Sequence, residues 1–227
     1  MPDMNVVTVN GDQVEVNWFQ STSTQTAGYI VYYYDGLTGT PPTPTGSPID
    51  TINDPTITTY IDNNADPNTQ SYAYTVAAFD DCGNTTVFNF DPHNSIFVDA
   101  AVDACEQEIT LSWNEYINWP GISEYRIQAD VDGNLQPVES LPEGSISFIY
   151  DIDAIDGDSV CYTIEAVHQD GSPVSASNEI CFSLDLVRST TFNFLRNITV
   201  NASGAIEVSW YADTAADVNN FIIERGQ

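Results

Sequence analysis

The feature that most constrains the fold is a segment that occurs three times. An alternating apolar–polar stretch, broken by turn residues, ends each time on a tryptophan: "VVTVNGDQVEVNW" on Trp18, "AAVDACEQEITLSW" on Trp113 and "NITVNASGAIEVSW" on Trp210. Alternation with a period of two is typical of half-buried β-strands, and Asn10-Gly11 in the first copy is a favoured pair for a tight hairpin turn. The tryptophans are 95 and 97 residues apart. The chain therefore repeats a unit of the size of one β-sandwich.

Further alternating segments follow each tryptophan. In the first unit they predict strands near residues 48–52, 56–61, 70–79 and 85–90, and in the second near 135–141, 145–150, 159–167 and 174–183. About seven short strands per hundred residues indicate an all-β fold of tandem antiparallel β-sandwiches. We predict one sandwich at 1–97, a second at 98–187, and the N-terminal part of a third, incomplete sandwich at 188–227. The remaining strands of the third are expected beyond Gln227.

The charge is strongly one-sided, with 33 acidic residues against four arginines, no lysine and a net charge of −29. Such a surface repels phosphate backbones and anionic lipid headgroups, so we expect neither nucleic acid nor a membrane surface as a partner. No run of eighteen apolar residues occurs, so membrane insertion is not expected either. The acidity suits divalent cations, but it also simply keeps a secreted protein in solution.

The stretch "SYAYTVAAFDDCGNTT" contains a Y-x-Y-x-V-x-A pattern that begins at Tyr72 and resembles strand F of fibronectin type III domains. The resemblance implies a fibronectin type III or immunoglobulin-like sandwich in which Tyr72 is the corner tyrosine before that strand. It also implies that Trp18 is the core tryptophan of strand B. Val160 stands at the corresponding position of the second unit, so no corner hydrogen bond is expected there.

A longer string of motifs runs from Cys82 to Cys181 in the order Cys-Gly-Asn, Pro-His, Cys, Trp-x-x-Tyr-x-x-Trp, Cys-Tyr and Ser-Asn-x-x-Cys, within a resemblance that covers about residues 1–187. This string resembles the tandem fibronectin-like region of gliding-motility-associated proteins, which are large cell-surface proteins of Bacteroidetes exported by type IX secretion. The resemblance implies a secreted chain on the extracellular cell surface, with neighbouring domains of the same long chain as its partners. The sorting domain of that family is expected after Gln227.

Four cysteines in a secreted-looking β-protein predict two disulfides. Cys161 and Cys181 lie ten residues on either side of Gly171, the tip of the last hairpin of the second unit, so they face each other within disulfide reach. Cys82 and Cys105 can pair only if the chain reverses at "DPHN" (91–94), which has the composition of a turn. We predict both bonds, because an unpaired extracellular thiol is a liability.

No catalytic pattern occurs in the residues. His93 and His168 are the only histidines, and both fall in predicted turns. The sequence has no metal-spaced histidine or cysteine set, no phosphate-binding loop, no nucleophile elbow and no Ser-His-Asp arrangement. We therefore expect a protein that is not an enzyme and needs no cofactor.

Two loops are candidates for ligand binding. The loop "DIDAIDGDS" contains Asp151, Asp153, Asp156 and Asp158, and carboxylates clustered in this way suit Ca²⁺. Its spacing departs from that of an EF-hand-like loop, and a solvated turn is the preferred interpretation. Trp119 in "YINWPG" has the exposed, loop-borne character of a sugar-stacking residue. An aromatic residue beside proline more often packs over the end of a core or against a neighbouring domain, and this interpretation is preferred.

These observations predict a non-catalytic extracellular surface protein whose tandem sandwiches act as a scaffold or spacer in adhesion or gliding motility. Two alternatives remain open. The chain can be a carbohydrate-binding module that recognises a surface polysaccharide or another surface protein through Trp119 and the acidic loops. It can also be the accessory region of a secreted hydrolase.

Overall fold

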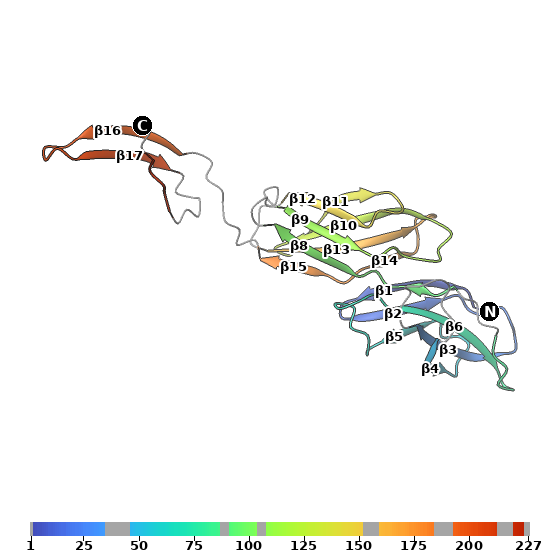
Figure 1. Cartoon of the computed structure of the whole chain (residues 1–227). Helices are drawn as coiled ribbons and strands as arrows, with labels where there is room; N and C mark the ends of the chain where they lie inside the picture. The colour runs from blue at the N-terminus through green and yellow to red at the C-terminus, as the bar shows by residue number, and fades with distance from the viewer. Residues whose placement is uncertain are drawn as a thin grey trace. The chain divides into compact units, whose positions relative to one another are not determined.

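The structure is a computed structural model that describes residues 2–34, 46–86, 91–103, 108–151, 159–183, 193–212 and 220–224. Every regular element within these ranges is a β-strand, and the named strands pair in antiparallel sheets (Figure 1). In the described part of the chain, no helix is long and apolar enough to cross a membrane. The chain divides into two compact units, Met1–Leu184 and Asp185–Gln227.

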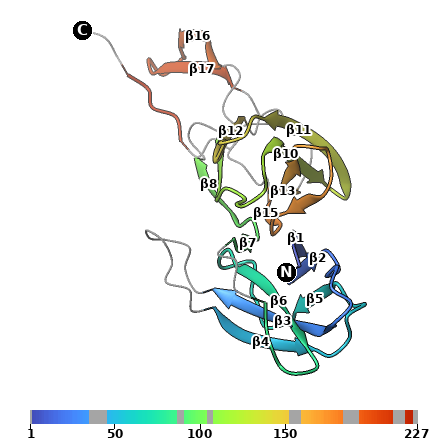
Figure 2. The same cartoon turned by 90° about the vertical axis from the view of Figure 1, so that its right-hand side faces the viewer.

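The first sandwich consists of a three-stranded sheet in the order β1-β2-β5 and a four-stranded sheet in the order β4-β3-β6-β7 (Figure 2). Its strands are β1 (Met4–Asn10), β2 (Gln13–Trp18), β3 (Thr26–Tyr34), β4 (Ser47–Ile52), β5 (Thr59–Asp62), β6 (Ala73–Asp80) and β7 (His93–Asn94). This strand order is that of a fibronectin type III-like sandwich.

The second sandwich repeats the arrangement. One sheet has the order β8-β9-β12, and the other has the order β11-β10-β13, with β14 and β15 both pairing to β13. Its strands are β8 (Val98–Asp103), β9 (Glu108–Trp113), β10 (Ile122–Val131), β11 (Asn134–Leu141), β12 (Ser147–Asp151), β13 (Ser159–His168), β14 (Val174–Ala176) and β15 (Ile180–Ser183). The predicted all-β fold of tandem antiparallel sandwiches is confirmed.

Alternation along each strand produces the two cores. In β2, and in β10 from Tyr125 onward, every second side chain is buried, as a period of two requires when one face of a sheet meets a second sheet. The repeated tryptophans lie in these cores against a tyrosine of the next strand. The ring centroids of Trp18 and Tyr29 are 5.3 Å apart, and those of Trp113 and Tyr125 are 6.0 Å apart.

Two local predictions can be compared with the first sandwich. The hydroxyl of Tyr72 accepts the backbone N–H of Asp66 (3.0 Å), so the tyrosine corner is present. The first hairpin turn lies one residue later than predicted, because Asn10 pairs with Gln13 and Gly11 takes the positive φ of +61°. Glycine adopts such a φ without steric cost, which explains its position in the turn.

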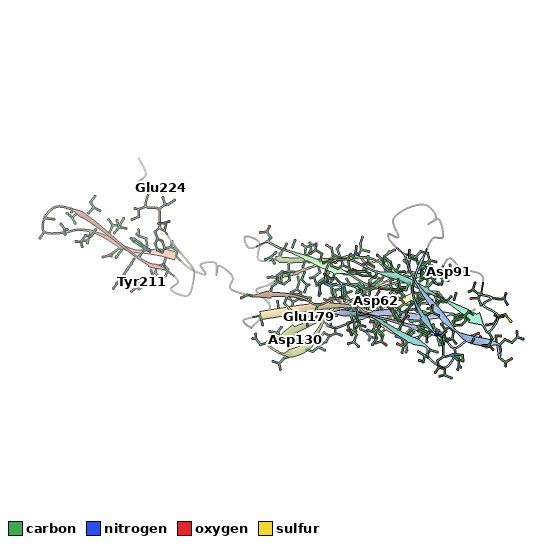
Figure 3. The ribbon with its side chains drawn as sticks, turned by 90° about the horizontal axis from the view of Figure 1, so that it is seen from below. Asp62, Asp91, Asp130, Glu179, Tyr211 and Glu224 are labelled. Carbon is green, nitrogen blue, oxygen red and sulfur yellow. A yellow bond between two sulfur atoms is a disulfide. The ribbon has the colours of Figure 1, made fainter. Side chains whose placement is uncertain are left out.

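The unit Asp185–Gln227 contains a hairpin of β16 (Asn193–Val200) and β17 (Ile206–Ala212), which includes Tyr211 (Figure 3). Trp210 lies 5.4 Å from Phe221, centroid to centroid, which repeats the tryptophan–aromatic contact of both sandwiches. The side chains are more exposed here: Trp210 is 36% exposed, whereas Trp18 and Trp113 are 3% and 5% exposed. The described residues of this unit therefore show the local pattern of the repeat but do not enclose a core.

Candidate functional site

The outer edge of β1 forms a junction with the second sandwich. β1 pairs with β2 on one side only, so the backbone groups on its other side need partners elsewhere. The hydroxyl of Tyr116 accepts the N–H of Val7 (3.0 Å), and the hydroxyl of Ser175 donates to the carbonyl of Val7 (2.7 Å). The indole N–H of Trp119 donates to the carbonyl of Asn5 (2.8 Å). The free edge of the first sandwich is thereby hydrogen-bonded to the second.

Tyr116 is the centre of this junction. Its hydroxyl lies 2.9 Å from Nδ1 of His93, and its backbone N–H donates to the hydroxyl of Tyr125 (2.9 Å) in the second core. Because the phenol oxygen already accepts the N–H of Val7, we assign the phenol proton to the bond with Nδ1. This makes His93 the neutral tautomer that carries its hydrogen on Nε2. One phenol group therefore joins β1, β7 and the loop after β9.

Burial determines the protonation state of both rings. His93 is 5% exposed, and desolvation lowers the pKa of its imidazole from 6.5 to about 4. Tyr116 is 4% exposed, and desolvation raises the pKa of its phenol, although the hydrogen bond from the N–H of Val7 acts in the opposite direction. Both groups are neutral at neutral pH, so their hydrogen bond is insensitive to salt.

Buried amide side chains hold the connecting segment in place. The Asn94 side chain donates to the carbonyl of Glu115 (2.9 Å) and accepts the N–H of Ile117 (2.9 Å). The Asn178 side chain accepts the N–H of Val98 (2.8 Å) and donates to the carbonyl of the same residue (3.0 Å). Asn94 and Asn178 are 2% and 3% exposed, so a shift of either segment would leave a buried amide unpaired.

A cavity of about 440 Å³ lies beside this junction. Its wall is formed by both sandwiches. The first contributes the N-terminal segment with the start of β1, the residue after β2, β6 and the segment at β7, and the second contributes the loop after β9 and the hairpin after β13. The described residues that line it are Pro2, Asp3, Met4, Asn5, Phe19, Thr75, Asp91, His93, Asn118, Trp119, Pro120, His168, Asp170, Ser172 and Pro173.

The lining of the cavity is both acidic and aromatic. Asp3, Asp91 and Asp170 contribute carboxyl groups, and Asp91 is labelled in Figure 3. Trp119 lies against Tyr116 with their ring centroids 3.9 Å apart, and it lies edge-on to His168 at 5.4 Å. Nδ1 of His168 accepts the backbone N–H of Asp170 (3.2 Å). The two histidines of the chain therefore both line this cavity, with their Nδ1 atoms already hydrogen-bonded.

The structure places Trp119 against the neighbouring sandwich, as the preferred interpretation of its loop predicts. Its N–H is used by the carbonyl of Asn5, and the ring contacts Tyr116 and His168. The role of Tyr116 and His93 was not predicted from the sequence. The motifs Pro-His and Trp-x-x-Tyr-x-x-Trp do mark these positions, but their spacing does not reveal that they meet.

Of the predicted disulfides, the Cys161–Cys181 bond is present, and the two residues face each other between β13 and β15. The predicted Cys82–Cys105 bond is wrong, because the thiol of Cys82 is free and exposed. Cys105 lies outside the described residues. The expected chain reversal at 91–94 is also wrong, because His93 and Asn94 form the buried strand β7 beside β6. Without that reversal, the argument for bringing Cys82 and Cys105 together fails.

The proposed Ca²⁺ loop falls largely outside the described residues. Asp151 ends β12, whereas Asp153, Asp156 and Asp158 lie in the part of the chain that is not described. Among the described residues, potential metal ligands converge at Cys161, Glu179 and Cys181. The two sulfur atoms of this group are bonded to each other, so they are not available to a metal ion.

No family model matches the chain, and no curated protein matches its sequence. The fold is similar to that in pectate lyase PelI from Erwinia chrysanthemi in complex with tetragalacturonic acid (TM-score 0.31, 10% identity, 38% of this chain and 27% of that chain). It is also similar to the chicken CNTN1 FN1-FN3 domains (TM-score 0.32, 16% identity, 80% and 64%) and to the chicken interferon gamma receptor alpha chain (TM-score 0.30, 11% identity, 80% and 97%). The similar region thus spans 27% of the pectate lyase chain.

Proposed function

We propose that the chain is a non-catalytic scaffold of an extracellular surface protein, in which tandem sandwiches hold neighbouring domains at a fixed spacing during adhesion or gliding motility. The observation that carries this proposal is the hydrogen-bonded edge of β1. Val7 uses both its N–H and its carbonyl to bind side chains of the second sandwich. A spacer that transmits force needs such a junction, whereas a flexible linker would allow the two sandwiches to reorient independently.

The described polar groups support a structural rather than a catalytic role. The buried histidine, His93, is neutral and bonded to Tyr116. The buried amides Asn94 and Asn178 are bonded to backbone groups. In an acid–base catalyst we would expect a perturbed group with free access to a substrate, and these groups are instead occupied by contacts within the protein.

The secreted, cell-surface location is supported by the Cys161–Cys181 disulfide, because such bonds persist in oxidising compartments. The resemblance of the motif string to gliding-motility-associated proteins favours a bacterial surface. The contacts of Trp119 weaken the carbohydrate-binding alternative, because one ring face lies against Tyr116 and the indole N–H is already used.

Two measurements test the proposal. Residual dipolar couplings of the two sandwiches should fit one common alignment tensor, and two separate tensors would contradict a stiff spacer. Antibodies against the chain should label intact cells of the producing organism, and mild protease treatment of those cells should remove the label. Labelling only after the cells are broken open would contradict the surface location.

A further inference from the structure

We propose that the cavity at the junction binds a basic peptide, with the guanidinium or ammonium group of an arginine or lysine side chain held inside it. A scaffold needs no such ligand, so this inference does not rest on the proposed function. It rests on the charge, the spacing and the unsatisfied polar group of the cavity wall.

The carboxylates of the wall have no arginine or lysine among the described lining residues to balance them, although Oδ2 of Asp170 lies 3.6 Å from Nδ1 of His168. Asp3, Asp91 and Asp170 line the cavity, and neither arginine nor lysine occurs among the described lining residues. The whole chain lacks lysine and has a net charge of −29. Arg126, an arginine of the second sandwich, is already paired with Glu124 (2.6 Å). A cation that enters the cavity therefore gains attraction from several carboxylates, and Asp3 and Asp91 have no ion-pair partner among the described residues that it would have to displace.

The spacing of the carboxylates favours an organic cation over a metal ion. A metal ion needs ligand atoms that converge on one point. Among the described residues such convergence occurs at Cys161, Glu179 and Cys181, and none of these three lines the cavity. An extended side chain with several N–H donors can instead reach separate acceptors. A volume of about 440 Å³ suits a group of that size.

Thr75 provides an independent reason to expect a ligand with hydrogen-bond donors. Thr75 is one of the residues that line the cavity and is 1% exposed, and its hydroxyl oxygen has no hydrogen-bond partner among the described residues. A buried hydroxyl without a partner is unfavourable. An N–H donor of the ligand would satisfy this oxygen and remove that cost on binding.

The remaining wall is compatible with a cation. The indole ring of Trp119 is part of it, and guanidinium and ammonium groups are attracted to aromatic rings. His93 lines the same space but is held neutral by burial, which lowers its pKa to about 4, so it adds no positive charge at neutral pH. Nδ1 of His168 accepts the N–H of Asp170 (3.2 Å).

The test uses the full chain and a short capped peptide with one arginine between glycines. Indole N–H resonances in a heteronuclear NMR spectrum report on each of the four tryptophans separately. We expect the peptide to shift the Trp119 resonance and to leave that of Trp210, in the other unit, unchanged. The same peptide with lysine should also shift it. The peptide with citrulline, which has the shape of arginine but no charge, should bind about tenfold more weakly or not at all.

Variants distinguish binding in the cavity from the general attraction of a cationic peptide to an acidic protein. Asp91→Asn should weaken the arginine peptide by about tenfold, because its exposed carboxylate lines the cavity. Glu108→Gln is the matched control: it removes an exposed charge at the opposite end of β9 from the loop that carries Trp119. It should change affinity less than about twofold.

Three results would overturn the proposal. Equal binding of the arginine and citrulline peptides would show that charge does not matter. Equal weakening by Glu108→Gln and by the cavity variant would show that only the net charge of the protein attracts the peptide. A neutral disaccharide that shifts the Trp119 resonance while the arginine peptide does not would assign the cavity to a sugar. None of these results bears on the scaffold proposal, which the dipolar couplings test separately.

Discussion

Part of the loss of stability on acidification should come from one buried residue, His93. Its imidazole is buried at the junction, and its Nδ1 accepts the phenol proton of Tyr116. Protonation would place a hydrogen on Nδ1 and a charge in a desolvated site. In the folded protein the pKa of His93 is lowered to about 4, whereas an exposed histidine has a pKa of about 6.5.

The magnitude follows from this difference in pKa. A gap of about 2.5 pKa units corresponds to about 3 kcal/mol of unfolding free energy, at about 1.4 kcal/mol per unit. Between about pH 6.5 and about pH 4 the unfolded state binds the proton and the folded state does not. The contribution of His93 is therefore fully present above about pH 6.5, falls as the pH falls, and is exhausted near pH 4, below which both states are protonated.

Urea unfolding of the chain and of His93→Gln, at about pH 7.5 and about pH 4.5, isolates this contribution. Glutamine keeps an acceptor for the phenol of Tyr116 but does not titrate. The 33 acidic residues titrate in both proteins, so their effect cancels when the two acid-induced losses are subtracted. Between these two pH values the unmodified chain should lose about 2.5 kcal/mol more than the variant. Equal losses would refute the assignment of a neutral, buried His93.

Three further changes test the contacts on which the fold depends. Tyr116→Phe should lower the unfolding free energy by about 2–4 kcal/mol, because a buried backbone N–H and a buried histidine lose their partner. Tyr162→Phe removes a buried hydroxyl that has no hydrogen-bond partner among the described residues, and it should cost nothing. Similar losses for the two variants, measured by urea unfolding, would contradict the role of the junction. Reduction of the Cys161–Cys181 bond should lower the stability of the second sandwich by about 3 kcal/mol, because the bond closes a loop with a sequence separation of 20. An unfolding transition that calorimetry shows to be unchanged by reductant would contradict this stabilising role. Gly28→Ala should lower the unfolding free energy by about 1–3 kcal/mol, because an added Cβ would collide with a carbonyl oxygen of β4 and a phenylalanine ring of β6. An unchanged melting temperature would show that the strands move apart freely.

The strands and the cores were predictable because the alternation that produces them lies within short stretches of the sequence. A period of two determines which side chains of β2 and β10 face the opposite sheet, and that period is visible in the sequence. The Cys161–Cys181 bond was predictable for a similar reason, since symmetry about Gly171 determines which residues face each other in the hairpin. The tyrosine corner followed from the resemblance of one strand to a known pattern.

The junction was not predictable, because its contacts join residues far apart in the chain. Val7 and Tyr116 are separated by 109 residues, and Ser175 and Val7 by 168. The two-residue strand β7 is too short to have a period, and its sequence has the composition of a turn. Its strand conformation depends on pairing with β6 and on the contacts of Asn94 with the loop after β9.

The hydrogen bonds of the junction determine how the two sandwiches are placed more than how strongly they associate. A typical internal hydrogen bond contributes only about 1 kcal/mol, because water offers similar bonds in the unfolded chain. A buried donor or acceptor that loses its partner costs about 1–3 kcal/mol. Any other placement of the second sandwich against β1 would leave Val7, Tyr116 and His93 with unpaired buried groups. An apolar junction would tolerate sliding at little cost, whereas a shift of this junction would leave several buried polar groups unpaired, which agrees with the proposed role as a fixed spacer.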